Sequence, residues 1–205
     1  MSTTNETGNI LVVCLANVCR SVLAELVLNE SLGDAGTLEV RSAGVKANGA
    51  MACRDVADRR PAGRWRNQVA AHTAYPLVEE DIANADLILT ACVASRGAVA
   101  KIAPESRHRT FTLNEAVWLG REHRPATTVN REAVRSFASY LDDRRALDGM
   151  PPAPVRRWWR RHSTRDPLSI PDGHNLGDRA HRKTLDAVEQ TTRRIAAQLA
   201  AEIPS

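Results

Sequence analysis

Short apolar runs and segments of helical periodicity follow one another along most of the chain. The apolar run 10–13 predicts a buried strand, and 21–28 is typical of a helix. Further elements alternate in the same way, with strands at 38–42, 86–90 and 109–113, and helices within 45–70 and at 92–102, 129–147 and 179–203. Because strands that alternate with helices build right-handed βαβ units, we expect a three-layer, doubly wound α/β fold. Its sheet would be parallel and four-stranded, with helices on both faces.

The domain organisation follows from the chain length and from one segment that does not fit this alternation. At 205 residues the chain is long enough for one domain with a full hydrophobic core. We expect 1–8 to be a disordered lead-in and 9–205 to form that domain, with a helical insertion at about 119–165. Trp158 and Trp159, flanked by arginines, indicate either a patch for nucleic acid or acidic membranes, or a short helix that buries its tryptophans. We favour the second interpretation.

Charge and cysteine content narrow the class of protein. The formal net charge is +4, from 28 Lys and Arg against 24 Asp and Glu. This balance suits an anionic substrate but is too small to predict a nucleic-acid partner. No apolar run approaches the roughly 20 residues that span a membrane, so no membrane contact is expected. The four cysteines show no paired zinc spacing, and without a secretory segment we expect them to stay reduced in the cytoplasm.

A loop between the first strand and the first helix carries the candidate chemistry. It runs from Cys14 to Ser21, where the unpaired N–H groups and positive dipole end of the helix favour a bound oxyanion. A thiol reacts as its thiolate, which a helix N-terminus and a nearby guanidinium favour. Arg20 can offer two parallel donors to a tetrahedral anion, and Ser21 can donate a hydrogen bond to the sulfur. The residues expected to bind phosphate are Leu15, Ala16, Asn17, Val18, Cys19, Arg20 and Ser21.

The arrangement Cys-x5-Arg-Ser directly after the first strand resembles the active-site loop of the low-molecular-weight protein tyrosine phosphatases. Segments 42–45, 72–90 and 111–115 resemble further parts of that family. The resemblance implies a phosphocysteine intermediate on Cys14, phosphate binding by Arg20, and neither a metal nor an organic cofactor. The family usually has glycine where Ala16 stands. If that position needed a positive φ, alanine would cost about 1 kcal/mol.

The general acid has two candidates. In the family an aspartate, usually followed by proline, precedes the last helix, protonates the leaving oxygen and then activates water. Asp166 is followed by Pro167, as expected. Asp172 lacks the proline, but its distance to the last helix and the preceding Ile-Pro match the family better. We favour Asp172 and keep Asp166 as the alternative; the other aspartate would be an ordinary turn residue.

Three further residues have expected roles around the loop. Ser42 and His72 stand, with Asn17, where the family forms a hydrogen-bond network that shapes the loop, although His72 could be a plain surface histidine. Cys19 would either form a reversible disulfide with Cys14 under oxidation or serve as a small packing residue.

The sequence says less about selectivity for phosphotyrosine than about the phosphate-binding loop. The family places aromatic residues after the acid, whereas Leu168, His174 and Asn175 stand near that place here. Trp118, or a tryptophan of the insertion, would have to replace them. We therefore expect the partner to be a phosphotyrosine protein with altered specificity, or a smaller phosphomonoester.

The sequence thus predicts a phosphomonoester hydrolase, namely a cysteine-dependent protein-tyrosine-phosphatase. One alternative is an arsenate reductase of the same fold that uses a small-molecule thiol. Cys92 lies where the thioredoxin-coupled reductases carry a second redox cysteine, but 95–101 lacks their third. Another alternative is a catalytically silent phosphate-binding regulatory module whose insertion binds a partner. The intact Cys14, Arg20 and Ser21 favour the enzyme.

Overall fold

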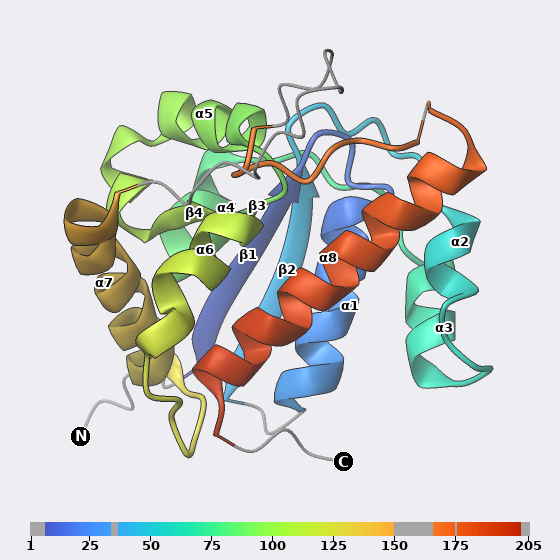
Figure 1. Cartoon of the computed structure of the whole chain (residues 1–205). Coiled ribbons are helices and arrows are strands. Elements are labelled where there is room, and N and C mark those ends of the chain that lie inside the picture. The colour runs from blue at the N-terminus through green and yellow to red at the C-terminus, as the bar shows by residue number, and fades with distance from the viewer. Residues whose placement is uncertain (1–6, 34–36, 150–165, 175, 202–205) are drawn as a thin grey trace, which may run out of the picture.

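The computed structural model describes residues 7–33, 37–149, 166–174 and 176–201 of the chain. Its core is one parallel sheet with the strand order β2-β1-β3-β4 (Figure 1). The strands are β1 (Gly8–Cys14), β2 (Leu38–Gly44), β3 (Leu87–Thr90) and β4 (Thr110–Thr112). All neighbouring strands pair in parallel, so the predicted four-stranded, doubly wound α/β fold is confirmed.

Helices cover both faces of this sheet (Figure 1). On β1, Ile10 and Val12 face one cluster of buried side chains, and Leu11 and Val13 face another, as the two-residue period of a strand requires. The first cluster includes residues of α1, α6, α7 and α8, and the second includes residues of α4 and α5. The bounds of these helices are α1 (Arg20–Leu32), α4 (Glu79–Asn84), α5 (Val93–Ile102), α6 (Leu113–Leu119), α7 (Arg131–Asp148) and α8 (Asp178–Leu199).

Helix α8 lies along α1 and α6 (Figure 1). Its apolar stripe is fully buried, and the stripe consists of Leu185, Val188, Ile195 and Leu199. The helix ends earlier than predicted, because Ala200 leaves the helix and forms a parallel β-bridge with Ala126.

Segment 45–70 contains the predicted helical structure as two short helices, α2 (Arg54–Ala57) and α3 (Arg64–Ala70). Ion pairs hold the end of α2 against the long helices. Arg59 pairs with Asp186 at 2.6 Å, and Arg60 pairs with Glu30 of α1. Cys53 immediately precedes α2, and its backbone N–H donates to the carbonyl of Val18 at 2.8 Å.

The predicted insertion begins with a helix that is part of the core. The apolar face of α7 is buried as expected, and it consists of Val134, Phe137, Ala138 and Leu141. Arg131 and Arg135 of α7 both reach the carboxylate of Asp86, next to β3. Trp158 and Trp159 lie outside the described residues, as do 1–6 of the expected lead-in; its last residue, Gly8, begins β1.

Helix α6 and the turns η1 (Pro104–Arg109) and η2 (Gly120–Glu122) were not predicted. The signal for α6 was present as a capping box. Thr112 accepts a hydrogen bond from the backbone of Glu115, whose carboxylate accepts one from the backbone of Thr112. Within the described ranges, no helix is long and apolar enough to cross a membrane.

Candidate active site

The Cys14–Ser21 loop lies at the carboxyl end of the central strand. Cys14 is the last residue of β1 and pairs with Gly44, the last residue of β2. Helix α1 begins at Arg20, and no side chain caps its first turn. The N–H groups of that turn are therefore free of intrahelical and capping partners, and they face the loop. Ligands of doubly wound sheets bind at this edge, where neighbouring connections leave in opposite directions.

The sulfur of Cys14 is buried and receives polar contacts. Its Sγ lies 3.0 Å from the hydroxyl of Ser21 and 3.2 Å from the backbone N–H of Asn17. The Ser21 hydroxyl already accepts a hydrogen bond from the side chain of Asn17, so its own hydrogen is available for the sulfur. Donors aimed at sulfur favour the thiolate form, which is the reactive form of cysteine.

The side chain of Asn17 joins the loop to its surroundings. Its amide nitrogen donates to Ser21 and, at 2.7 Å, to Ser42, while its amide oxygen accepts the backbone N–H of Tyr75. All donors and acceptors of this buried amide are engaged apart from one lone pair, and such a network rigidifies a loop. The His72 ring completes it, because its Nε2 lies 3.1 Å from the carbonyl oxygen of Asn17. The structure thus brings Ser42 and His72 to the loop.

The backbone of the loop bends at Asn17 rather than at Ala16. Asn17 has a φ of 54°. Among the described residues, it is the only one other than glycine with a positive φ. Asparagine tolerates this conformation better than most residues. Ala16 therefore carries no such strain, and the expected cost of alanine at that position does not arise.

Sequence reasoning did not single out two residues that lie near the loop. Glu25 lies one turn after Ser21 on α1, and its carboxylate accepts a hydrogen bond from the Ser42 hydroxyl. Burial raises the pKa of Glu25, although the hydrogen bond from Ser42 opposes this shift. A side chain at Gly44 would meet the loop backbone, because a Cβ there would lie 2.8 Å from the Asn17 nitrogen. The position of Glu25 on the same helix face as Ser21 was the available signal.

Arg20 reaches across the site to the segment before α8. Its side chain is buried, and its guanidinium donates to Asp172 at 2.6 Å and to the carbonyl of Ile170 at 3.2 Å. The other carboxylate oxygen of Asp172 accepts the backbone N–H of His174. The structure therefore places Asp172 beside the residue expected to bind phosphate, with its side chain about half exposed to solvent.

Asp166 occupies a different position. Its carboxylate accepts the backbone N–H of Leu168 and the hydroxyl of Ser169, at 3.0 and 2.7 Å. These bonds to the residues that follow are typical of an aspartate that stabilises its own turn. The structure shows no contact between Asp166 and the loop residues.

The segment that carries Asp172 is seated on α8. The Thr184 hydroxyl of α8 donates to the carbonyl of Pro171. Gly173 fits because it lacks a side chain, since a Cβ there would lie 2.5 Å from the carbonyl oxygen of Ala180. Tight packing on both sides of Asp172 restricts where its carboxylate can go.

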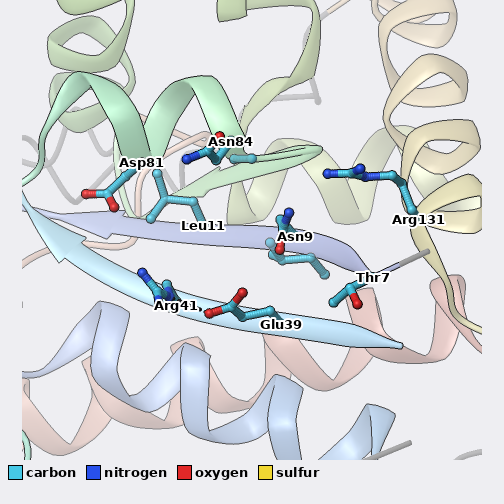
Figure 2. Close-up of a pocket in the computed structure, with 10 residues that line it drawn as sticks. Thr7, Asn9, Leu11, Glu39, Arg41, Asp81, Asn84 and Arg131 are labelled. Carbon is cyan, nitrogen blue, oxygen red and sulfur yellow. Dashed lines mark hydrogen bonds and ion pairs between the residues drawn. The ribbon is translucent and has the colours of Figure 1, made fainter. Parts of the chain in front are cut away.

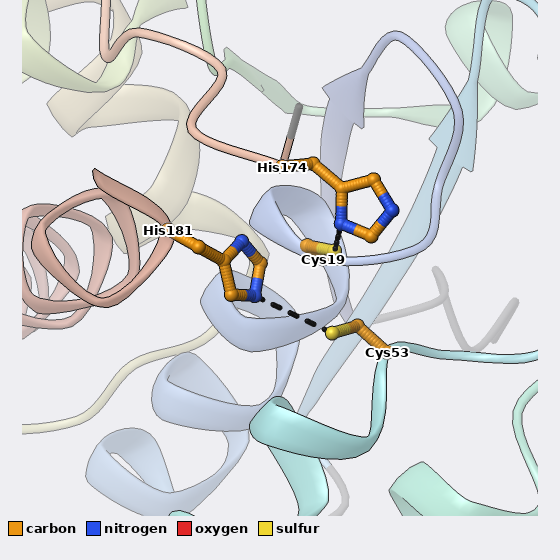
Figure 3. Close-up of side chains that lie close together, drawn as sticks. All are labelled: Cys19, Cys53, His174 and His181. Carbon is orange, nitrogen blue, oxygen red and sulfur yellow. Dashed lines mark hydrogen bonds between the residues drawn. The ribbon is translucent and has the colours of Figure 1, made fainter. Parts of the chain in front are cut away.

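Cys19 has different neighbours from Cys14. Its Sγ lies 3.8 Å from Nδ1 of His174, and Cys53 and His181 lie close by (Figure 3). Burial raises the pKa of the Cys19 thiol, and the adjacent Cys53 raises it further. All four cysteines are free. A neutral thiol is a poor nucleophile, so the loop offers Cys14 rather than Cys19 for attack.

Trp118 does not supply the missing aromatic wall. Helix α6 starts at the carboxyl end of β4 and runs away from it, so its last turn, with Trp118, lies away from the loop. The ring packs against the core and against the guanidinium of Arg121, 4.3 Å from its centroid. Among the described residues, Leu15 of the loop is exposed, and so is Tyr75, whose backbone N–H bonds to Asn17.

A separate cavity of about 430 Å³ lies beside β1 and β2 (Figure 2). Its lining mixes acids, amides and arginines, among them Asn9, Glu39, Arg41, Asp81 and Arg131. None of its lining residues belongs to the Cys14–Ser21 loop. The cavity is therefore distinct from the candidate active site.

A sequence profile of known families matches this chain. The description of the matching family is "low molecular weight phosphotyrosine protein phosphatase", and the match covers residues 9–130. This range includes the whole Cys14–Ser21 loop together with Ser42 and His72. No curated protein sequence matches the chain.

Solved structures of similar fold include phosphatases from bacteria. A mutant of YwlE from Bacillus subtilis has a TM-score of 0.59 and 21% identity, covering 94% of this chain and 98% of that one. The YwlE arginine phosphatase from Geobacillus stearothermophilus has a TM-score of 0.58 and 21% identity, covering 93% and 91%. The tyrosine phosphatase Wzb from Escherichia coli K30, in complex with phosphate, has a TM-score of 0.58 and 21% identity, covering 95% and 99%. These likenesses bear on the fold.

Proposed function

Because the chain belongs to the low molecular weight phosphotyrosine protein phosphatase family, we propose that it removes phosphate from phosphotyrosine through a phosphocysteine on Cys14. The observation that carries the proposal is the surroundings of the Cys14 sulfur. This sulfur lies within hydrogen-bonding distance of the Ser21 hydroxyl and the Asn17 N–H, at the start of a helix. Arg20 and Asp172 form an ion pair across the same site.

In the first step, the Cys14 thiolate attacks phosphorus in line with the leaving oxygen. The S–P bond forms as the P–O bond to the tyrosyl oxygen breaks, and the Asp172 carboxylic acid gives that oxygen its proton. Arg20 and the loop N–H groups bind the oxygens that do not leave. These donors are in place before the reaction, so they stabilise the transition-state charge without reorganisation.

In the second step, water replaces the sulfur. Asp172, now a carboxylate, accepts a proton from the attacking water, and the P–O bond forms as the S–P bond breaks. The Cys14 thiolate leaves with the electron pair, and the Ser21 hydroxyl steadies it by a hydrogen bond. The products are inorganic phosphate and the starting enzyme.

The ion pair between Arg20 and Asp172 places the proposed acid beside the proposed phosphate-binding residue. A phosphate dianion needs the same guanidinium and repels a carboxylate. The substrate would therefore compete with Asp172 for Arg20 and free its carboxyl group to face the leaving oxygen. One contact thus links phosphate binding to the placement of the acid.

Support for an aromatic leaving group comes from the apolar side chains next to the loop. Leu15 within the loop is 42% exposed, and Tyr75, whose N–H bonds to Asn17, is 48% exposed. We assign them to the contact with the phenyl ring of phosphotyrosine, because aromatic and aliphatic side chains gain most by covering an apolar ring.

The test is hydrolysis of an aryl phosphate and of a phosphotyrosine peptide by four purified proteins. Cys14→Ser should abolish turnover while still binding phosphate, and Asp172→Asn should lower kcat by about 10²–10⁴. Asp166→Asn should behave like the wild type. Equal losses for both aspartate variants, or wild-type rates for Cys14→Ser, would contradict the proposed roles.

Substrate class is tested with Tyr75→Ala. This variant should lower kcat/KM for the phosphotyrosine peptide by about tenfold and leave that for a small alkyl phosphate nearly unchanged. Leu147→Ala is the matched control, since Leu147 is an exposed apolar side chain at the C-terminal end of α7. Preference for phosphoserine or phosphoarginine peptides over phosphotyrosine would overturn the assignment of substrate.

A further inference from the structure

Four metal-binding side chains meet beside the phosphate loop, although each comes from a different segment (Figure 3). Cys19 comes from the end of the loop, Cys53 from the residue before α2, His174 from the segment of Asp172, and His181 from the first turns of α8. Their donor atoms all lie within 4.8 Å of one another.

The spacing of these atoms is close to that of a tetrahedral metal site. With Zn–S near 2.3 Å and Zn–N near 2.0 Å, neighbouring ligand atoms of a tetrahedron lie roughly 3.3–3.8 Å apart. In the structure, Cys19 Sγ and His174 Nδ1 are 3.8 Å apart, and Cys53 Sγ and His181 Nε2 are 3.4 Å apart. Movements of about 1 Å or less would bring the remaining pairs to this spacing.

The chemistry of the cluster selects the metal. Two thiolates and two imidazoles are the donor set of tetrahedral Zn²⁺ sites, whereas Mg²⁺ and Ca²⁺ require oxygen. The four residues are at least partly shielded, apart from the exposed His174, which provides a path of entry.

His181 contributes a buried imidazole to the cluster. The residue is 6% exposed, yet its Nδ1 is buried without a hydrogen-bond partner among the described residues. Its Nε2 lies 3.4 Å from the Cys53 sulfur and 3.3 Å from the carboxylate of Asp55. Nε2 faces the Cys53 sulfur and is therefore the atom that this ring offers to the cluster.

We propose that Cys19, Cys53, His174 and His181 bind one Zn²⁺ ion. On binding, both thiols lose their protons to solvent and the two imidazoles bind as neutral rings. Asp55 lies 3.3 Å from Nε2 of His181, so its carboxylate adds negative charge beside the cation.

The site would act on the segments that carry the phosphatase chemistry. Cys19 precedes Arg20 in the chain, and His174 follows Asp172 by two residues. A metal held by both sulfur and imidazole would tie the phosphate loop to the segment of the acid and to α8. The site lies outside the step at Cys14, whose sulfur is hydrogen-bonded by Ser21 and Asn17 and not by a residue of the cluster.

The test is metal binding by the full-length protein, measured with Zn²⁺ against a competing chelator and with Co²⁺ by absorption. Co²⁺ should give the intense visible bands of a tetrahedral site and thiolate-to-cobalt charge transfer, at one ion per chain. Cys53→Ser and His174→Ala should each weaken Zn²⁺ binding by more than about 100-fold, beyond the usual cost of removing an outer partner. Zn²⁺ should raise the melting temperature of the wild type and not that of these variants.

Matched controls use the same residue types away from the cluster. Cys92→Ser, at the start of α5, and His108→Ala, on the exposed surface of η1, should bind Zn²⁺ like the wild type. Cys14→Ser should also keep the ion, which separates this site from the phosphatase reaction. Octahedral Co²⁺ spectra, substoichiometric Zn²⁺, or equal binding by Cys53→Ser and Cys92→Ser would overturn the proposal.

Discussion

The guanidinium of Arg20 donates to the carboxylate of Asp172 at 2.6 Å, across 152 positions of sequence. One partner starts α1 beside the nucleophilic loop, and the other lies in the segment packed on α8. The fold therefore closes the site by bringing its second half back over the carboxyl end of β1. This contact distinguishes Asp172 from Asp166, which bonds to its own turn.

Arg20→Lys tests whether the planar guanidinium is needed rather than its charge alone. Lysine keeps the positive charge but cannot donate two parallel hydrogen bonds to a phosphoryl group. We expect kcat/KM for an aryl phosphate to fall by about 10²-fold or more, from steady-state kinetics near neutral pH. Arg121→Lys, on the surface at η2, is the control and should leave the kinetics unchanged. A fall of less than threefold in Arg20→Lys would argue against bidentate binding.

Asn17 combines a positive φ with a fully used side chain, and two substitutions separate these roles. Asn17→Gly keeps the backbone freedom and loses the hydrogen bonds to Ser21, Ser42 and Tyr75. Asn17→Ala loses the same bonds and also strains φ. Both should lose most activity, and the alanine variant should be less stable than the glycine variant by about 1 kcal/mol in urea unfolding. Equal stability of the two variants would contradict the strain argument.

Gly44→Ala tests how closely β2 supports the loop. The new Cβ would lie 2.8 Å from the loop backbone, so Asn17 and the Cys14 sulfur it contacts must shift. Small displacements of reacting groups are costly, and we expect kcat to fall by about tenfold to 100-fold. Gly97→Ala is the control, since nothing lies near its Cβ on α5. That variant should keep full activity and gain about 0.5–1 kcal/mol of stability.

Substitution of Asp86 tests whether its ion pairs with α7 stabilise the fold. Burial alone would raise the pKa of Asp86, but hydrogen bonds from Arg135, the Asn9 backbone and Arg131 outweigh it and lower the pKa. A lowered pKa contributes stability that is present above the ordinary value near 4 and is lost as pH falls through the folded value.

Asp86→Asn should therefore cost about 2 kcal/mol of unfolding free energy at pH 7, with the cost shrinking below about pH 4. Denaturant unfolding across this pH range gives the measurement. The control is Asp143→Asn, an exposed change on α7, which should change the unfolding free energy little at any pH. A pH-independent loss in Asp86→Asn would mean that the ion pairs with α7 contribute nothing.

The sequence supported the fold and the loop well, for a physical reason. Apolar runs such as 10–13 are local, and Cys14 to Ser21 is a contiguous motif, so short-range pattern was sufficient. The positive φ at Asn17 was not foreseen, because the strain depends on contacts from β2 and the segment before α4. Glu25 was missed because it lies on α1, whereas its partner, Ser42, lies on β2.

The proposed zinc site was beyond sequence reasoning. Zinc motifs are recognised when two ligands lie close in sequence, whereas Cys19, Cys53 and His174 come from segments that only the folded chain brings together. The sequence likewise left Asp166 and Asp172 as alternatives, because the contacts of each carboxylate depend on the folded chain.

The central claim is that phosphate passes through a covalent bond to Cys14, and one measurement addresses it directly. Asp172→Asn is mixed with an aryl phosphate whose leaving group needs no protonation, quenched in acid, and digested for mass spectrometry. Because the variant lacks the base that activates water, it should accumulate one phosphoryl group on the peptide that contains Cys14. Turnover by this variant with no phosphate on Cys14, or with phosphate on another residue, would contradict the mechanism.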